Sequence, residues 1–279
     1  MLAAILSLGG IGLAAAVALG FAAKKFAVEV DPREQAILEV LPNANCGACG
    51  FPGCSGYAKM VATSDKIAAA CPPGGAVVME KIANIMGLAP VEAEPMVAVV
   101  LCQGDDGKAR QKYHYLGVHD CVAAQKVADG PKTCPSGCLG LGTCARVCPF
   151  DAIEMTPDGL AVISRARCTG CGKCVSSCPR SVIGMKPLDA TVHVLCNSHD
   201  KGGLVRKYCD IGCIGCMICK KTAPTAYEIE NFLASVVYEN HGDAEVAIEK
   251  CPTKCIRNFM DGYPEGSSFS APTCMREAG

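Results

Sequence analysis

The chain has 279 residues, and 22 of them are cysteine. Aromatic residues make up only 5% of the sequence and tryptophan is absent, so the large side chains that stabilise ordinary cores are scarce. A formal net charge of −1 argues against nucleic acid as a partner, because such proteins usually carry a basic excess. The composition therefore points to a chain cross-linked by disulfides or by metal.

The N-terminal segment contains no charged side chain from Leu2 to Ala23 and ends at Lys24 and Lys25. This length meets the requirement of about 20 apolar residues for crossing a bilayer. In a signal peptide the positive charge would precede the apolar run. We therefore expect residues 1–25 to form a single-pass anchor in a bacterial inner membrane. The two lysines place the cysteine-rich part on the cytoplasmic side.

The first group of cysteines lies within residues 26–90, which we expect to form a small module. Its members are Cys46, Cys49, Cys54 and Cys71. Glycines between them allow the tight backbone turns that a cluster-binding loop needs. Since this spacing differs from that of ferredoxins, we predict a separate four-cysteine [4Fe-4S] site. Structural zinc is the alternative here.

Residues 168–179 carry the run C-x2-C-x2-C-x3-C-P, which is typical of bacterial ferredoxins and favours iron–sulfur clusters over disulfides or zinc. In two-cluster ferredoxins the fourth cysteine of each run binds the other cluster. The earlier run has Leu141 at its middle ligand position, and Cys134, four residues before Cys138, is a candidate replacement. We predict one cluster on Cys134, Cys138, Cys144 and Cys178, and another on Cys148, Cys168, Cys171 and Cys174. This two-cluster domain would span residues 133–190, after a connecting segment with short strands at 91–132.

A degenerate copy of the ferredoxin pattern occupies residues 191–261. Cys213, Cys216 and Cys219 form a triplet, and Cys251 precedes a proline. The positions that would bind the second cluster hold Ala223, His241, Ala244 and Ala247. All four ligands of one cluster are therefore lost together, and we predict a single cluster on Cys213, Cys216, Cys219 and Cys251. Residues 262–279 are expected to be a C-terminal tail.

Six cysteines remain outside these four predicted sites: Cys102, Cys121, Cys196, Cys209, Cys255 and Cys274. A buried thiol often behaves as a small apolar side chain, so a structural role is the simplest interpretation. Cys209 is a competing ligand candidate, because it precedes Cys213 by four residues, as Cys134 precedes Cys138. No nucleotide-binding glycine loop or hydrolase-type triad is evident, so we expect no catalytic residues on this chain alone.

These features together resemble the B subunit of the Rnf ion-translocating electron-transport complex. The resemblance rests on the anchor, Asn45 to Cys54 with Cys71, Gly137 to Gly142, and Cys168 to Pro179. It implies an α+β chain with one N-terminal transmembrane helix, a small four-cysteine iron–sulfur module and ferredoxin-like 4Fe-4S domains.

The resemblance also implies a function. About four [4Fe-4S] clusters would relay electrons from soluble ferredoxin towards flavin subunits and NAD⁺, coupled to Na⁺ or H⁺ transport. The partners would be the other membrane and flavin subunits of the complex, ferredoxin and the lipid bilayer. Two alternatives are an electron-transfer subunit of a membrane hydrogenase or formate-oxidising complex, and a membrane-tethered redox sensor.

Overall fold

The computed structural model describes the whole chain except residues 1, 27–30, 65, 68, 93 and 260–279. The described part combines helices with short two-stranded antiparallel sheets. The predicted tail, residues 262–279, lies outside the described residues, and so does Cys274.

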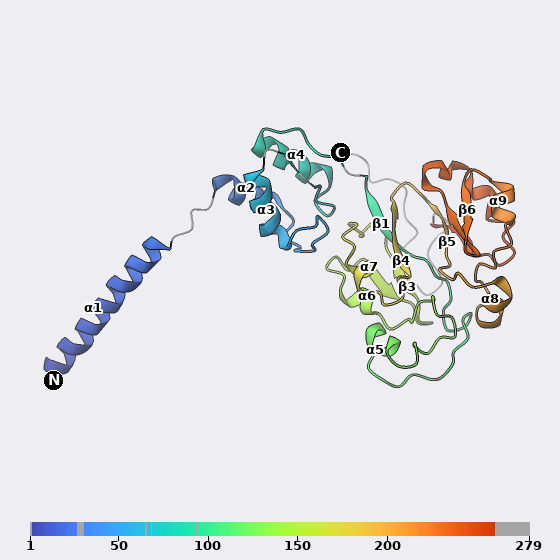
Figure 1. Cartoon of the computed structure of the whole chain (residues 1–279), viewed down its shortest axis with the longest axis horizontal. Helices are drawn as coiled ribbons and strands as arrows, with labels where there is room; N and C mark the ends of the chain where they lie inside the picture. The colour runs from blue at the N-terminus through green and yellow to red at the C-terminus, as the bar shows by residue number, and fades with distance from the viewer. Residues whose placement is uncertain (1, 27–30, 65, 68, 93, 260–279) are drawn as a thin grey trace.

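Helix α1 (Leu2–Lys25) projects away from the rest of the molecule (Figure 1). Its large apolar side chains are exposed where the structure describes them, with Leu13 and Leu19 both 71% accessible. The residues whose side chains are described include no helix that is long and apolar enough to cross a membrane.

Three helices form a compact N-terminal module: α2 (Pro32–Val40), α3 (Gly53–Thr63) and α4 (Gly75–Met86). Helix α2 begins where the Asp31 carboxylate accepts a hydrogen bond from the backbone N–H of Arg33, 2.8 Å away, and Pro32 supplies a first-turn residue that needs no such partner. The core of the module contains Ile37, Tyr57 and Ile82, each at most 1% exposed. The three helices therefore hold the loops that carry Cys46, Cys49 and Cys71, and Cys54 lies in the first turn of α3.

The middle of the chain contains two small sheets. Strand β1 (Met96–Val100) pairs with β4 (Ile183–Pro187), and β2 (Ile153–Met155) pairs with β3 (Ala161–Ile163). The first Cys-Pro pair is followed by β2 and the second by β4, but these two strands do not pair with each other. The apolar strand β1 is almost fully buried and takes β4 as its partner, so part of the predicted connecting segment belongs to this sheet.

Short helices accompany these sheets. They are α5 (Cys121–Gln125), α6 (Thr143–Arg146) and α7 (Lys173–Ser177). Each of them contains or directly adjoins cysteines, so the helices position thiols rather than contribute a large apolar face.

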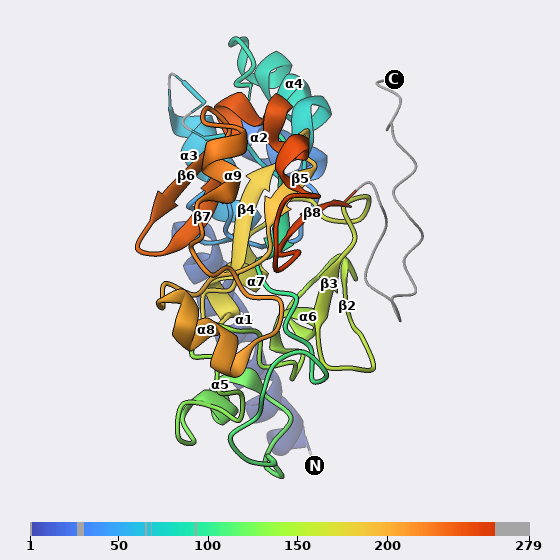
Figure 2. The same ribbon diagram turned by 90° about the vertical axis from the view of Figure 1, so that its right-hand side faces the viewer.

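The C-terminal part repeats this plan. Strand β5 (Val192–Val194) pairs with β8 (Ile256–Asn258), and β6 (Tyr227–Glu230) pairs with β7 (Leu233–Val236) (Figure 2). The helical elements are α8 (Gly202–Tyr208), α9 (Ile218–Thr222) and the 3₁₀ segment η1 (Tyr238–Ala247). The strand β5 begins soon after β4 ends, which joins the two parts closely.

Candidate metal centres

All 21 described cysteines are free thiols. They fall into five groups, and four of these groups line separate small cavities. Outside the masked residues, no three His, Cys, Asp or Glu side chains converge on a point that could hold one metal ion.

The N-terminal module brings Cys46, Cys49, Cys54 and Cys71 together. Burial raises the pKa of Cys71, and the negative charges of the three other thiolates raise it further. The Asn45 side chain accepts a hydrogen bond from the backbone N–H of Cys54 at 2.9 Å. A Cβ on Gly53 would lie 2.8 Å from the Asn45 side-chain oxygen. Only glycine therefore fits there without moving Asn45, which supports the loop that carries the cysteines.

The cavity beside α7 is lined by Cys148, Cys168, Cys171 and Cys174. Backbone N–H groups point at two of its sulfurs, from Ala152 to the Cys148 Sγ and from Ala98 to the Cys168 Sγ, both at 3.4 Å. Such bonds stabilise a thiolate and are a recognised means of tuning cluster potential. The structure therefore groups the four thiols that the sequence predicts for this cluster.

The cavity beside α6 is lined by Cys121, Cys138, Cys144 and Cys178. Cys134, which the sequence predicts for this group, does not line it, and Cys121 takes the fourth position. The cause is a polar link: the backbone N–H of Cys121 donates to the Thr143 hydroxyl at 2.7 Å, and Thr143 in turn donates to Asp120. This link holds the start of α5 against α6 and places Cys121 next to Cys144.

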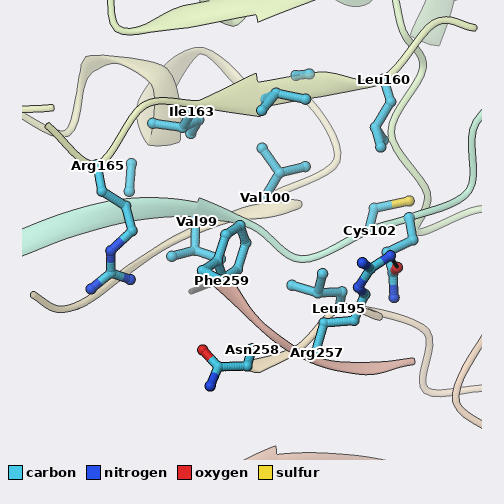
Figure 3. Close-up of a pocket in the computed structure, with 14 residues that line it drawn as sticks. Val99, Val100, Cys102, Leu160, Ile163, Arg165, Leu195, Arg257, Asn258 and Phe259 are labelled. Carbon is cyan, nitrogen blue, oxygen red and sulfur yellow. Dashed lines mark hydrogen bonds between the residues drawn. The ribbon is translucent and has the colours of Figure 1, made fainter. Parts of the chain in front are cut away.

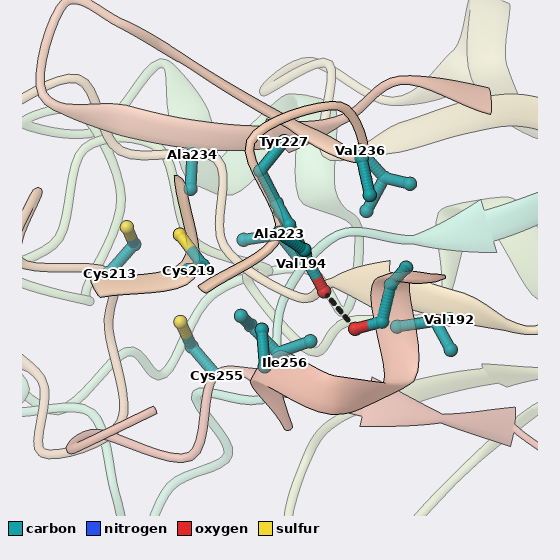
Figure 4. Packing of buried hydrophobic residues seen from close by; sticks show 13 residues of the cluster. Val192, Val194, Cys213, Cys219, Ala223, Tyr227, Ala234, Val236, Cys255 and Ile256 are labelled. Carbon is teal, nitrogen blue, oxygen red and sulfur yellow. Dashed lines mark hydrogen bonds between the residues drawn. The ribbon is translucent and has the colours of Figure 1, made fainter. Parts of the chain in front are cut away.

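The C-terminal cavity is lined by Cys213, Cys216, Cys219, Cys251 and Cys255, and Figure 4 shows three of these thiols facing one space. The fifth thiol, Cys255, lies 3.6 Å from the Cys251 sulfur. Hydrogen bonding to Cys255 lowers the pKa of Cys213 to about 6 and that of Cys251 to about 5. Cys216 is exposed, in contrast to the others.

The space where a ferredoxin would bind its second cluster is filled by side chains. Ala223, Ala244 and Ala247, each at most 4% exposed, belong to one apolar cluster with Tyr227 (Figure 4). The Tyr227 hydroxyl donates a hydrogen bond to the Ala244 carbonyl at 2.7 Å. A ring packed among alanines therefore occupies the side of this domain that has lost its cysteines, while His241 approaches Asp189 at 3.9 Å.

Three cavities share a turn that requires glycine. Gly140, Gly170 and Gly215 each follow a cavity cysteine by two residues and adopt positive φ values of 77°, 72° and 64°. A Cβ at these positions would lie 2.3 to 2.7 Å from a backbone oxygen of another segment. The chain must therefore turn sharply and pass close to a neighbour just after the first thiol.

The last group comprises Cys102, Cys134, Cys196 and Cys209, which line a cavity between the middle and C-terminal parts of the chain. We call it the junction cavity. Sequence spacing does not reveal this group, because its members are separated by 32, 62 and 13 residues.

Electrostatic interactions between thiols link the five groups one to the next, from the N-terminal module to the C-terminal domain. Burial raises the pKa of Cys171, and the Cys46 thiolate of the first module raises it further. Three further pairs of thiols show the same effect between neighbouring groups. The charge of Cys174 raises the pKa of Cys144, that of Cys102 raises the pKa of Cys138, and that of Cys213 raises the pKa of Cys196. Each group therefore has a neighbour within electrostatic range.

A further pocket lies between β1 and β8 and contains only one thiol, that of Cys102 (Figure 3). Its other lining is largely aliphatic, with Phe259 at one side. This pocket lacks the donor set of a cluster site.

Comparison with known proteins agrees with this geometry. The B subunit of the proton-translocating ferredoxin:NAD(+) oxidoreductase complex of Clostridium ljungdahlii is 43% identical over 256 residues, which cover 90% of each chain. This chain belongs to that B-subunit family. The B subunit of the ion-translocating oxidoreductase complex of Methanosarcina acetivorans is 41% identical, over 89% of this chain and 95% of the relative. The B subunit of the Na(+)-translocating ferredoxin:NAD(+) oxidoreductase complex of Acetobacterium woodii is 41% identical, over 94% and 79%.

Three domain families match within this B-subunit chain. They are an Fe-S cluster family at residues 41–73, a 4Fe-4S dicluster domain at 132–185, and a 4Fe-4S single-cluster domain of ferredoxin I at 209–258. The cofactors of this chain are therefore [4Fe-4S] clusters.

Proposed function

We propose that this chain is the electron-transfer subunit of an ion-translocating complex, which accepts electrons from reduced ferredoxin and passes them towards flavin subunits and NAD⁺. The observation that carries the proposal is the row of cysteine groups from the N-terminal module to the C-terminal domain. A [4Fe-4S] cluster, when bound, takes up and releases a single electron. The residues of this chain fix the order of the binding sites and the environment of each sulfur.

The geometry supports a specific assignment of ligands. We assign four clusters, each to four cysteine ligands. The ligand sets are Cys46, Cys49, Cys54 and Cys71; Cys148, Cys168, Cys171 and Cys174; Cys121, Cys138, Cys144 and Cys178; and Cys213, Cys216, Cys219 and Cys251. This differs from the sequence-based prediction at one position, where Cys121 replaces Cys134 because it lines the cavity with the other three.

Electrons would be received at the C-terminal cavity, where Cys216 reaches the surface. Exposed apolar residues lie close to it: Met217, the next residue, is 53% exposed, and Phe232, whose backbone lies against Gly215, is 47% exposed. Lys220 and Lys221 lie in the last turn of α9. An apolar contact ringed by positive charge suits an acidic ferredoxin, because complementary charge speeds and orients association.

A second basic group lies on α8 and at its N-terminus. Its members are Lys201, Arg206 and Lys207. Two acidic residues lie between positions 200 and 221 of the sequence. Asp210 pairs with Arg110 at 3.1 Å, and Asp200 accepts a hydrogen bond from the Tyr208 hydroxyl. Arg110 balances the charge of Asp210, while Asp200 keeps its negative charge, so the three cations of this region still exceed the unpaired acidic charge.

Reduction by ferredoxin tests this proposal. In the anaerobic complex, Lys220→Glu with Lys221→Glu should slow the bleaching of iron–sulfur absorbance by reduced ferredoxin about tenfold or more at low salt, and the effect should shrink at high salt. Lys59→Glu with Lys81→Glu changes the charge equally on the exposed helices α3 and α4 and should leave the rate unchanged. Equal rates in all three proteins would place the ferredoxin contact elsewhere.

The N-terminal helix would anchor the chain in the membrane next to the other subunits. Leu13, Val17 and Phe21 are 65% to 71% exposed on α1, and apolar surface of this extent requires a partner such as lipid or other apolar helices. The lysines at the end of α1 favour the cytoplasmic side for the cluster domains. The relatives are named for proton and for Na⁺ translocation at similar identity, so the similarity is compatible with either ion.

A further inference from the structure

The junction cavity carries a donor set that none of the four ligand sets assigned above uses. Cys102 follows β1, Cys196 follows β5, and Cys209 ends α8, while Cys134 lies in the loop before α6. Four separate segments thus deliver one thiol each to a single cavity. We propose that Cys102, Cys134, Cys196 and Cys209 bind an additional [4Fe-4S] cluster, beyond the sites that the ferredoxin-type runs predict.

Backbone N–H groups surround the sulfurs of this cavity. The N–H groups of Gly104 and Cys138 lie 3.3 and 3.4 Å from the Cys102 Sγ. Backbone N–H groups also donate hydrogen bonds to the sulfurs of the other three cysteines. The donors are Ser136 to Cys134, Ser198 and Cys213 to Cys196, and Ile211 and Gly212 to Cys209. Donors aimed at all four sulfurs are suited to thiolate ligands rather than to apolar thiols.

The donors follow the same local pattern as in the predicted cluster sites. Gly104 follows Cys102 by two residues, as Ser136 follows Cys134 and Ser198 follows Cys196. In the two flanking sites, Gly140 donates to Cys138 and Gly215 donates to Cys213 in the same i+2 relation. The junction cavity therefore reproduces the backbone environment of its neighbours.

Two buried cations adjoin the cavity. Arg180 is 8% exposed, and its guanidinium donates to the carbonyls of Cys134 and Gly137. Lys132 is 1% exposed and donates to the carbonyl of Gly104 at 2.7 Å, with Asp106 at 3.3 Å. A buried cation is strongly unfavourable unless negative charge lies nearby. Asp106 supplies negative charge for Lys132, and a cluster bound by four thiolates would supply it for Arg180.

The position of the cavity gives the additional cluster a role that rests on the proposed function. Cys134 is four residues from Cys138, and Cys209 is four residues from Cys213. Four residues span at most about 14 Å, so the cavity adjoins the sites on both sides. An electron taken from one neighbouring centre would be passed to the other, with no net oxidation of the site. The additional cluster would connect the clusters of the C-terminal domain with those of the two-cluster domain.

Iron and acid-labile sulfide contents of the anaerobically purified full chain test the site. We expect about 20 Fe and 20 sulfide per wild-type chain, and about 16 of each for Cys102→Ser with Cys196→Ser. Lys59→Glu with Lys81→Glu, which changes only exposed side chains of α3 and α4, should match the wild type. EPR of the reduced variant should retain the signals of the other centres, which would show that the fold survives.

Two results would overturn the proposal. One is a wild-type content of about 16 Fe that the double variant does not lower. The other is one equivalent of zinc in the wild type that the double variant loses while iron stays constant. Should the double variant fail to fold, the wild-type iron and zinc contents still decide. Metal content does not depend on ferredoxin, so failure of this site and failure of the proposed electron transfer are separable.

Discussion

The backbone N–H of Cys138 points at the sulfur of Cys102, 3.4 Å away. Cys138 lines the cavity beside α6, and Cys102 lines the junction cavity. One hydrogen bond therefore joins two adjacent groups of thiols, and the residue that contributes a thiol to one group stabilises a thiolate in the next. This direct connection makes the assignment of Cys134 and Cys121 the most informative point to test.

Pairs of cysteine variants show which thiols share a cluster. If Cys121 and Cys134 belong to different sites, Cys121→Ser with Cys134→Ser should lower the iron content by about eight per chain. Cys102→Ser with Cys134→Ser removes two thiols of one group and should lower it by only about four. Equal losses of about four Fe in the two double variants would restore the sequence-based assignment, in which Cys134 is the only ligand among these three cysteines.

The C-terminal cavity offers five thiols for one cluster. We expect Cys251→Ser to lose about four Fe per chain and Cys255→Ser to keep its iron, because Cys251 lies next to a proline as in ferredoxin runs. Iron analysis with EPR of the exposed centre distinguishes them. Loss of iron in Cys255→Ser alone would identify that residue as the ligand.

Much of this arrangement follows from sequence, and the reason is local spacing. The run from Cys168 to Cys178 sets three ligands within one short loop, so the chain can place them without help from distant segments. Cys121 could not be predicted because it lies 17 residues before Cys138 and reaches its group only through Thr143. The junction cavity is assembled from four distant segments, and its one sequence signal is the four-residue spacing shared by Cys134–Cys138 and Cys209–Cys213.

The partner of each strand also could not be predicted from the sequence pattern. Ile153 and Ile183 follow the two Cys-Pro pairs at similar spacing, which suggests strands that pair with each other. In the structure Ile153 lies opposite Ile163 and Ile183 lies opposite Val100. The competing partner, β1, lies far from both runs in the sequence, and burial of its valines decides the outcome.

Arg180 should influence the redox potential of the cluster proposed for the junction cavity. Replacing Arg180 with Gln removes a buried positive charge beside Cys134, which makes addition of an electron less favourable. We expect the midpoint potential of that centre to become more negative by about 60 mV, a tenfold change for a one-electron couple. Arg180→Lys keeps the charge and should restore most of the potential. EPR-monitored titration measures both, and equal potentials in all three proteins would exclude this role.

His193 should make the C-terminal domain less stable in mild acid. It is fully buried, and burial lowers its pKa from 6.5 to about 3. At a pH between these two values, His193 binds a proton in the unfolded chain but not in the folded chain. The contribution of neutral His193 to the free energy of unfolding is therefore complete above pH 6.5 and is lost as the pH falls towards 3. The contribution lost between pH 7 and pH 5 is about 2 kcal/mol.

The matched variant is His193→Phe, which keeps a ring between Tyr238 and Phe259. Anaerobic urea unfolding followed by circular dichroism should show a smaller loss of stability for the variant between pH 7 and pH 5 than for the wild type. Parallel losses in both proteins would assign the acid sensitivity to other groups.

Charge introduced into α1 tests the membrane anchor. Arginine near the centre of a spanning helix costs about 3 kcal/mol per residue, so Leu13→Arg with Val17→Arg should move the protein from the membrane fraction to the soluble fraction. Leu13→Ala with Val17→Ala should remain with the membrane. Retention of the arginine variant in washed membranes would show that other contacts hold the chain there.

EPR of the full-length chain, purified without oxygen and reduced with dithionite, tests the central claim that the cysteine groups form one electron-transfer row. We expect reduced [4Fe-4S] signals broadened by magnetic interaction between neighbouring centres, because each group of thiols lies beside the next. Zinc with little acid-labile sulfide, or reduced clusters whose signals show no interaction, would contradict it.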